Sequence, residues 1–318
     1  MGKVSRWLRD NNIIVIVVVT TIIFYLINPR FLSGENVVAI SRQIVPIGLI
    51  VLGQFFVLVS GNIDLSMGMS SVFFAILLGV FFGMLGGVVI GIIAVFVVSL
   101  MLGAINGYFI GKVKVPAFIV TLATMFIVTG LSGLIIPPRQ MIFLRGGFFK
   151  FIGSAKLFGM YYSTLILLVL FVIAWFLYNK TKFGGYVIAI GDNEENAKLV
   201  GINVTKMKMI IFMISAFCSG LAGIILSSRM GFVQPGLDGA SIMMDAITAI
   251  IIGGTLLQGG KGTVGGVFWG LLFIGIINNS LNLLNVQDVW HQVFKGIVII
   301  AALVLNWAIR KQSGIEAH

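Results

Sequence analysis

A short polar segment separates two apolar runs that are long enough to cross a membrane. Residues 60–68 read Ser-Gly-Asn-Ile-Asp-Leu-Ser-Met-Gly, so they supply an amide at Asn62, a carboxylate at Asp64 and a hydroxyl at Ser66. Hydrocarbon cannot hydrogen-bond an open backbone, so such a break is stable at membrane depth only inside protein or beside water. Because an ionisable group held there is a functional candidate, we expect the segment to line a pathway through the membrane.

The elements that must position this segment are membrane helices. The chain has 318 residues, of which 59% are hydrophobic and 10% charged. This composition is too apolar for a soluble domain and indicates an all-α polytopic membrane protein that forms one domain over residues 1–318. The apolar runs predict about ten transmembrane helices, at residues 13–27, 41–59, 66–84, 87–110, 116–136, 161–178, 209–227, 243–257, 263–281 and 291–308.

These ranges divide into two groups of five around the hydrophilic connection 137–160. The first half covers about residues 1–136 and the second about residues 161–318. An odd number of spans in each half places the halves in opposite orientations, which predicts a 5+5 inverted repeat with broken helices. We expect the counterpart of the break at 60–68 in the glycine-rich stretches 253–255 and 259–262.

Lysine and arginine predict the orientation, because cytoplasmic loops are enriched in both. With the N-terminus inside, 13 of the 21 basic residues fall on the inner side, which leaves 8 outside, four of them in the loop 137–160. We therefore expect both termini in the cytoplasm. The inner residues are Lys3, Arg6, Arg9, Lys112, Lys114, Lys180, Lys182, Lys198, Lys206, Lys208, Lys261, Arg310 and Lys311.

The net charge of +11 does not indicate a nucleic-acid partner. The basic residues are scattered over short loops, whereas a nucleic-acid-binding domain gathers them on one soluble face. Membrane topology explains them, and lipid is the expected surrounding.

The inner connection 179–208 contains a short helix with recognisable ends. We expect Asp192 to cap it, Glu195 to close a capping box and Gly201 to end it in a left-handed conformation. Glu194 and Lys198 stand four residues apart, the spacing of a helical ion pair. The helix has few apolar residues, and Ala197, Leu199 and Val200 would gain by docking into a groove on a partner; the alternative is a solvated surface helix.

No phosphate-binding loop is recognisable in the chain. Residues 255–262 fail the pattern G-x-x-x-x-G-K-[ST] twice, because Thr255 stands in place of the first glycine and Gly262 follows Lys261. Any ATP-driven action therefore needs a second polypeptide. We expect no cofactor or metal on this chain.

Two carboxylates, Asp64 and Asp245, are the only acidic residues that we place within the apolar spans or at their breaks. A carboxylate pair can perform general acid and base catalysis, but neither residue lies in a protease signature. Asp64 could equally cap the helix that begins near Ser66, and Asp245 could pair with a nearby polar group. We do not expect an enzyme.

Several intramembrane amides and aromatic rings could bind a neutral polyhydroxylated ligand, since amides both donate and accept hydrogen bonds. Hydrogen bonding between helices is the structural alternative for each of them. The residues concerned are Gln54, Asn106, Phe118, Trp269, Asn278, Asn279 and Asn282.

Taken together, these segments resemble the membrane permease subunits of ribose- and galactose-type sugar ABC importers. Residues 60–68 are similar to that family's Gly-x-Asp-Leu-Ser-x-Gly break, and residues 190–204 resemble its cytoplasmic coupling loop. Residues 245–262 resemble its D-A-I-A-A…G-G-T-S-L-x-G-G-x-G segment, and residues 278–284 its N-N-G-L-N-L-L run. Met243, Ser280 and Asn62 depart from the family's usual residues at these places.

The resemblance implies a multi-pass subunit of the bacterial cytoplasmic membrane that works as a homo- or heterodimer with a second permease subunit. It also implies a cytoplasmic ABC ATPase, which would bind the ATP, and an extracytoplasmic sugar-binding protein. The translocation pathway would include Asn62, Asp64, Ser66, Asn106, Phe118, Asp245, Asn278, Asn279 and Asn282. The segment Asp192, Glu194, Glu195, Lys198 and Gly201 would couple to the ATPase.

Two other functions fit part of the pattern. In an ion-coupled secondary transporter of a small polar solute, Asp64 would bind a proton or cation, but the inner helix would then have no role. An intramembrane hydrolase would require both Asp64 and Asp245.

Overall fold

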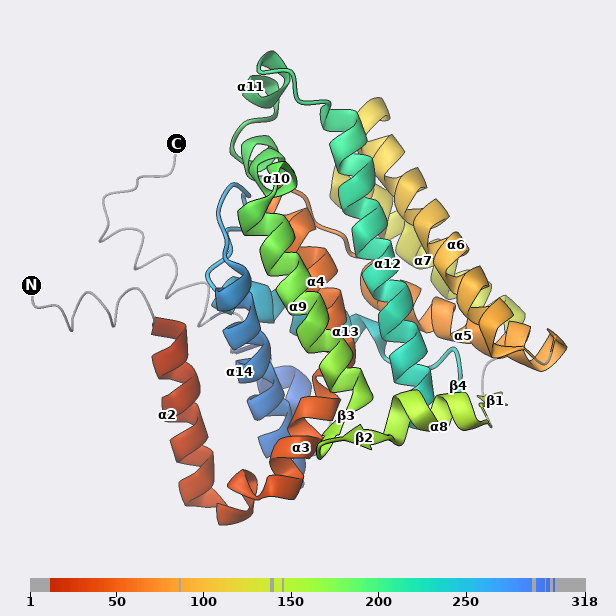
Figure 1. Cartoon of the computed structure of the whole chain (residues 1–318), viewed down its shortest axis with the longest axis vertical. Coiled ribbons are helices and arrows are strands. Elements are labelled where there is room, and N and C mark those ends of the chain that lie inside the picture. The colour runs from red at the N-terminus through yellow and green to blue at the C-terminus, as the bar shows by residue number, and fades with distance from the viewer. Residues whose placement is uncertain are drawn as a thin grey trace, which may run out of the picture.

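The computed structural model describes residues 12–85, 87–137, 140–144, 146–287, 290–294, 296–297 and 300. The predicted all-α membrane class is confirmed (Figure 1). Five helices of the described chain, namely α6 continued by η2, α7, α9, α12 and α14, are long and apolar enough to cross a membrane. The pair α3–α4, bent by 44°, makes a sixth candidate.

The first group of helices is α2 (Asn12–Ile27), the 3-10 helix η1 (Pro29–Leu32), α3 (Gly34–Gln43), α4 (Val45–Val59), α5 (Met67–Leu85), α6 (Val88–Tyr108), the π-helix η2 (Phe109–Val113) and α7 (Ala117–Ile135). The second is α8 (Gly147–Ser154), α9 (Tyr162–Lys180), α10 (Lys182–Asp192), α11 (Glu194–Leu199), α12 (Val204–Met230), α13 (Gly239–Ile252) and α14 (Val264–Leu283). The short strands are β1 (Ile142–Phe143), β2 (Lys156–Leu157), β3 (Met160–Tyr161) and β4 (Phe232–Val233).

Helices cover the predicted ranges from 13–27 to 263–281, with two differences. The range 41–59 is the bent pair α3–α4, because Val45 starts a new helix that carries proline in its first turn. The range 243–257 begins earlier and ends at Ile252, where Gly253 and Gly254 stop the helix. The range 291–308 and the terminal basic residues lie largely or wholly outside the described residues, so the number of spans stays a prediction.

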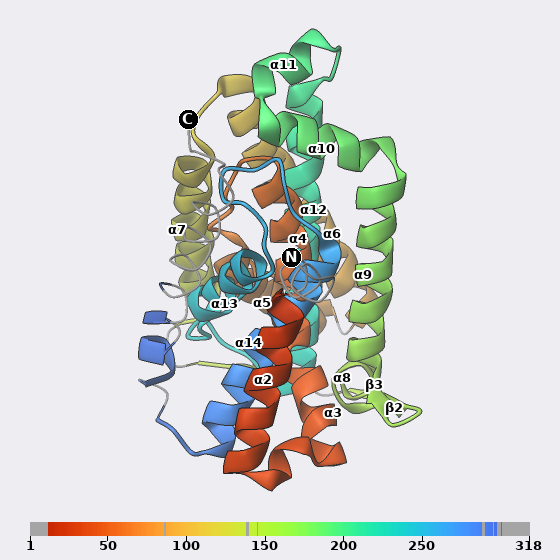
Figure 2. The same ribbon diagram turned by 90° about the vertical axis from the view of Figure 1, so that its left-hand side faces the viewer.

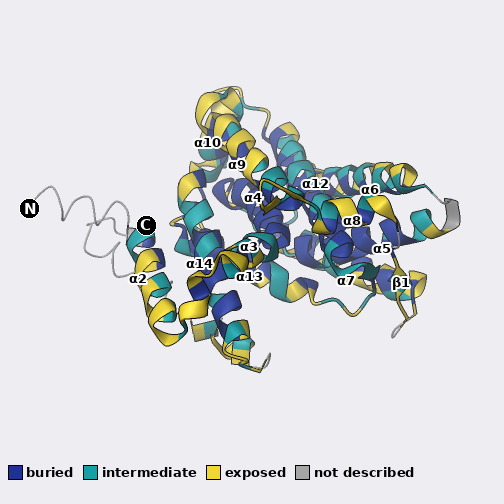
Figure 3. Cartoon of the chain, turned by 60° about the horizontal axis from the view of Figure 1, so that its bottom comes forward, coloured by how far each residue is buried: buried dark blue, intermediate teal, exposed yellow. Residues whose placement is uncertain are grey.

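Helices α4 and α12 form the centre of the molecule. Every residue of α4 is buried, as expected of a helix that is apolar on all sides. Helix α12 packs along α4, α5 and α6, and Figure 3 shows the buried α4 among helices with more exposed surface. The second half of the chain therefore packs directly into the first.

Small residues allow α6 and α12 to approach closely. A Cβ atom on Gly103 would lie 2.6 Å from the Cα of Met213, and one on Gly107 would lie 2.4 Å from the Cα of Met209. Glycines at four-residue spacing have this use in membrane bundles. The stripe that contains Gly103 and Gly107 thus serves packing within the chain.

Short strands and α8 close the end of the molecule that lies opposite α11 (Figure 1). β1 pairs with β4 in antiparallel register, Ile142 opposite Val233, which ties the 137–160 connection to the end of α12. β2 and β3 form a hairpin. The Arg42 side chain donates to the carbonyl of Gly153, so α8 is also fastened to α3.

Candidate functional site

The polar segment 60–66 connects α4 to α5 without helical structure. We call it the first break. Its Asp64 is only 2% exposed, and its carboxylate accepts three hydrogen bonds. Ser66 donates its backbone N–H at 2.9 Å and its hydroxyl at 2.6 Å to Oδ1, while Ser215 of α12 donates its hydroxyl at 2.7 Å to Oδ2. Asp64 thus orders the start of α5 and links it to α12, which meets the general requirement that buried polar groups find partners.

Side chains from two further helices hold the backbone of the first break. The Thr121 hydroxyl accepts from the N–H of Leu65 at 3.1 Å. The amide of Gln54 faces Asp64, where it can donate to the carbonyl at 3.2 Å and accept from the N–H at 3.3 Å. Asn62 instead bonds within the break, donating to the carbonyl of Ser60 at 2.9 Å. The backbone of the break is therefore held by α4 and α7 as well as by its own side chains.

A second non-helical segment, residues 253–263, connects α13 to α14. We call it the second break. The two helices that flank this break are also joined. Asn278 of α14 donates to the carboxylate of Asp245 of α13 at 2.9 Å, and both residues are buried. The Tyr178 hydroxyl of α9 donates to the carbonyl of Gly262 at 2.9 Å. This break is the glycine-rich stretch that the sequence indicated.

None of the described hydrogen bonds joins Asn106, Asn279, Phe118 or Asn282 to Asp64. Asn106 accepts from the Thr124 hydroxyl at 2.7 Å, which joins α6 to α7. Asn279 and Asn36 exchange two amide hydrogen bonds, at 2.9 and 3.0 Å, which join α14 to α3. Phe118 and Asn282 are exposed on the single chain. The described hydrogen bonds therefore divide the predicted set into separate groups.

The segment α10–α11 projects from the bundle at the end opposite the strands (Figure 1). Its capping differs from the prediction. α10 continues through Asp192, and Asn193, not Asp192, caps α11 by accepting from the N–H of Asn196 at 2.9 Å. Asn193 takes this role because its own backbone is extended, with φ −162° and ψ 110°. The left-handed Gly201 (φ 85°) that follows α11 is as expected.

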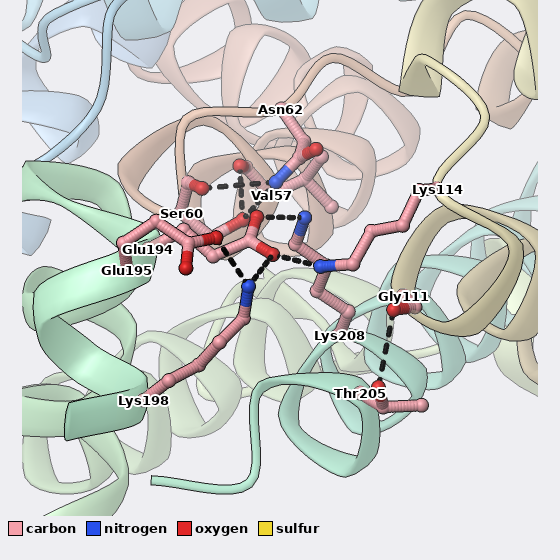
Figure 4. Close-up of polar contacts among 10 residues, drawn as sticks. All are labelled: Val57, Ser60, Asn62, Gly111, Lys114, Glu194, Glu195, Lys198, Thr205 and Lys208. Carbon is pink, nitrogen blue, oxygen red and sulfur yellow. Dashed lines mark hydrogen bonds and ion pairs between the residues drawn. The ribbon is translucent and has the colours of Figure 1, made fainter. Parts of the chain in front are cut away.

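Glu194 lies among three lysines (Figure 4). Lys208 of α12 contacts its Oε2 at 2.6 Å, Lys198 lies 3.4 Å from its Oε1 at the predicted spacing, and Lys114 contacts the same Oε1. Burial raises the pKa of Glu194, but hydrogen bonds from Lys114 and Lys208 and the charges of both outweigh this and lower the pKa to about 2. Glu194 therefore ties α11 to the start of α12 and to the end of η2.

The neighbouring side chains of α11 point elsewhere. Glu195 is 80% exposed and pairs with Lys198, so the expected capping box with Asp192 is absent. Ala197 is 2% exposed and belongs to the core of the chain itself, which contradicts its expected role in docking. Leu199 and Val200 are 85% and 76% exposed. The free apolar surface of α11 is therefore its C-terminal tip.

Sequence reasoning missed the long-range partners of this site. Ser215 lies 151 positions from Asp64, and Lys114 lies 80 positions from Glu194. No local sequence pattern marks such pairs. Ser215 lies on α12 and Lys114 follows η2, whereas the residues that they bind lie in the first break and in α11. Among the described residues, no three His, Cys, Asp or Glu side chains form a group that could hold a metal ion.

Comparison with known proteins gives one family. Residues 36–303 match the family described as the branched-chain amino acid transport system permease component. The ribose import permease of Haemophilus influenzae is 34% identical over 310 residues, covering 96% of this chain and 95% of the relative. That of Bacillus subtilis is 39% identical over 292 residues, covering 92% and 89%. The L-arabinose transport system permease of Escherichia coli is 34% identical, covering 87% and 84%. No solved structure matches the chain.

Proposed function

The chain belongs to the family of membrane permeases of monosaccharide ABC importers, and from this premise we propose that it forms the translocation pathway for a monosaccharide of the ribose or galactose class. A separate cytoplasmic ATPase drives it, an extracytoplasmic sugar-binding protein delivers the cargo, and a second permease subunit completes the pathway. The names of the relatives, which import ribose and transport arabinose, support a pentose as cargo.

The proposed architecture is one transmembrane domain of about ten helices in a 5+5 inverted repeat, with both termini in the cytoplasm. A reciprocal contact supports the repeat. A Cβ on Gly68 would lie 2.0 Å from the carbonyl oxygen of Gly239, and a Cβ on Gly239 would lie 2.5 Å from that of Gly68. A two-fold axis between the starts of α5 and α13 produces such a contact. The counterpart of the first break is then residues 231–238, before α13, rather than the second break.

The pathway runs past the first break and the Asp245–Asn278 pair. Asp64, Ser66 and Asn62 supply polar groups in the first break. Asp245 of α13 and Asn278 of α14 supply a second polar pair. The proposed pathway also includes Asn106, Asn279, Phe118 and Asn282. Asn106 and Asn279 are engaged in bonds between helices, as Asp245 and Asn278 are, and Phe118 and Asn282 are exposed on the single chain.

The exposed tip of α11 is the observation that carries the proposal of ATPase coupling. Leu199 and Val200 are exposed at the end of a short helix that Glu194 fixes to the start of α12 and to the end of η2. An apolar tip on a fixed helix suits a groove on a partner protein. Asp192, Glu195, Lys198 and Gly201 flank this tip and complete the proposed coupling surface.

Substitution of the tip tests the coupling. In proteoliposomes with the ATPase and the sugar-binding protein, Leu199→Asp should lower sugar-stimulated ATP hydrolysis by about tenfold or more, because a buried unpaired carboxylate at the interface costs several kcal/mol. Leu199→Met keeps an apolar surface and should retain stimulation. Equal stimulation in both variants, at equal amounts of inserted permease, would show that α11 is not the contact.

No described contact favours the ion-coupled alternative. Asp64 already accepts hydrogen bonds on both carboxylate oxygens, and such a function leaves α11 without a role.

A further inference from the structure

Three glycine-containing segments meet where α10 ends. Gly61 belongs to the first break, Gly191 is the last but one residue of α10, and Gly259 and Gly260 belong to the second break. We call this meeting point the inner junction. In Figures 1 and 2 the two breaks rise together toward α10, on the side of the molecule that carries α11.

The backbones of the inner junction are in direct contact. Gly260 donates its N–H to the carbonyl of Val59 at 2.8 Å, so a backbone hydrogen bond joins the second break to the end of α4. A Cβ on Gly191 would lie 1.9 Å from the Val59 oxygen and 2.5 Å from the Gly260 nitrogen. Gly191 therefore covers the bond that joins the second break to the end of α4, and any larger residue would push into it.

The other glycines of the inner junction adopt backbone conformations that suit this close contact. Gly61, Gly259 and Gly260 have φ of 75°, 90° and 75°, a region that favours glycine. A Cβ on Gly259 would lie 2.6 Å from the nitrogen of Gly61, so the two breaks also touch side by side. The remaining described backbone bonds of the second break are internal, as between Leu256 and Lys261 at 3.0 Å, or lead to the adjoining helices α13 and α14.

The segment that covers the junction is itself fastened. Just beyond Gly191, Glu194 is held by Lys208 at the start of α12 and by Lys114 after η2. Only Asn193 separates α11 from α10, and its N–H donates to the carbonyl of Ala189 in α10 at 3.1 Å, so we expect a displacement of α11 to move the end of α10 over the junction. The helix that offers its tip to a partner and the glycine that covers the two breaks lie within one continuous stretch, residues 182–201.

We propose that Gly191 is a positioning residue that keeps the two breaks joined, and that displacement of α10–α11 releases the bond between Gly260 and Val59 and opens the inner end of the pathway. This inference rests on the proposed function, because the displacing force comes from the ATPase. It adds the place at which that force reaches the pathway. The inner junction consists of a backbone hydrogen bond and packed glycines, with the Asp192 carboxylate lying against Gly260.

The first test substitutes the glycine. Gly191→Ala should keep sugar-stimulated ATP hydrolysis, since the tip of α11 is unaltered, but lower the sugar imported per ATP about tenfold, because overpacking shifts the joint from its closed state. Gly185→Ala is the matched control, since it lies on the same helix and its Cβ would meet nothing within 4 Å. Import per ATP that is equal in the two variants would overturn the inference.

The second test needs no transport. Amide hydrogen exchange over residues 256–262, which contain the Gly260 donor, should be about tenfold faster in Gly191→Ala than in Gly185→Ala. Exchange over residues 244–250 of α13 should be equal in both variants, which shows that the fold is intact. In the unmodified chain, the ATPase with ATP should speed exchange over 256–262.

The outcomes separate the two proposals. Exchange over 256–262 that responds neither to the substitution nor to ATP contradicts the role of Gly191, whatever the transport activity. Absence of ATP-driven import by the unmodified chain contradicts the proposed function instead, and the exchange comparison of the two glycine variants still tests the joint.

Discussion

Glu194 fixes the proposed coupling helix α11 from within the chain. Its carboxylate is engaged with lysines of its own chain, whereas the next residue, Glu195, is 80% exposed. Both glutamates are candidates for an ATPase contact on sequence alone. The geometry separates them, because Glu194 binds lysines outside α11, whereas Glu195 pairs with Lys198 of α11 itself and stays largely exposed.

This separation makes a prediction for neutral variants. Glu194→Gln should loosen α11 by about 1 kcal/mol, since partly exposed ion pairs are screened by solvent, and should lower sugar-stimulated ATP hydrolysis several-fold. Glu195→Gln is the control and should have a much smaller effect. Proteolytic susceptibility of residues 193–203 and ATP hydrolysis measure the two effects. A larger loss with Glu195→Gln would reverse the assignment.

The same residue should be insensitive to physiological pH. The pKa of Glu194 lies at about 2 in the folded chain and at 4.5 ordinarily, so its stabilising contribution is complete above the ordinary value and is lost as pH falls toward about 2. Coupling should therefore show no step from Glu194 between about pH 5.5 and 8.

At the scale of elements, helix α12 organises the molecule. It contacts α4, α5 and α6 along its length, donates Ser215 to Asp64 and receives the glycine face of α6. In lipid, such close packing replaces the hydrophobic drive that operates in water. The first break is thus held by a helix from the other half of the chain.

The packing of α6 on α12 is testable with one methyl group. Gly107→Ala would place a Cβ 2.4 Å from the Cα of Met209, and since backbone cannot move aside cheaply, we expect a loss of about 1–3 kcal/mol in unfolding free energy. Gly130→Ala in α7 meets nothing within 4 Å and should be neutral or slightly stabilising. Thermal unfolding in detergent compares the two, and equal stability would contradict the packing described.

At the scale of the whole molecule, two breaks from different halves meet beneath one projecting segment. The sequence predicted much of this arrangement. Polar residues inside apolar runs marked the first break, glycines marked the second, and Gly201 marked the end of α11. Each of these signals is local, because it depends on residues within one or two helical turns.

The parts that sequence did not predict depend on distant partners. Helix α10 was missed because its two adjacent glycines, Gly184 and Gly185, disfavour a helix, whereas packing against Tyr178 requires a glycine at 184. Asp192 is a plausible cap by type, but the continuation of α10 moves the cap to Asn193. The split of the predicted pathway residues into separate groups likewise follows from helix packing and not from composition.

The central claim is that this chain conducts sugar only when a partner ATPase acts on α11. The most direct measurement is uptake of labelled ribose into proteoliposomes that contain the permease, with or without the ATPase and ATP, and with the sugar-binding protein present in both cases. We predict accumulation against a gradient only with both ATPase and ATP. Accumulation by the permease without them, driven by an ion gradient or a membrane potential, would contradict the account.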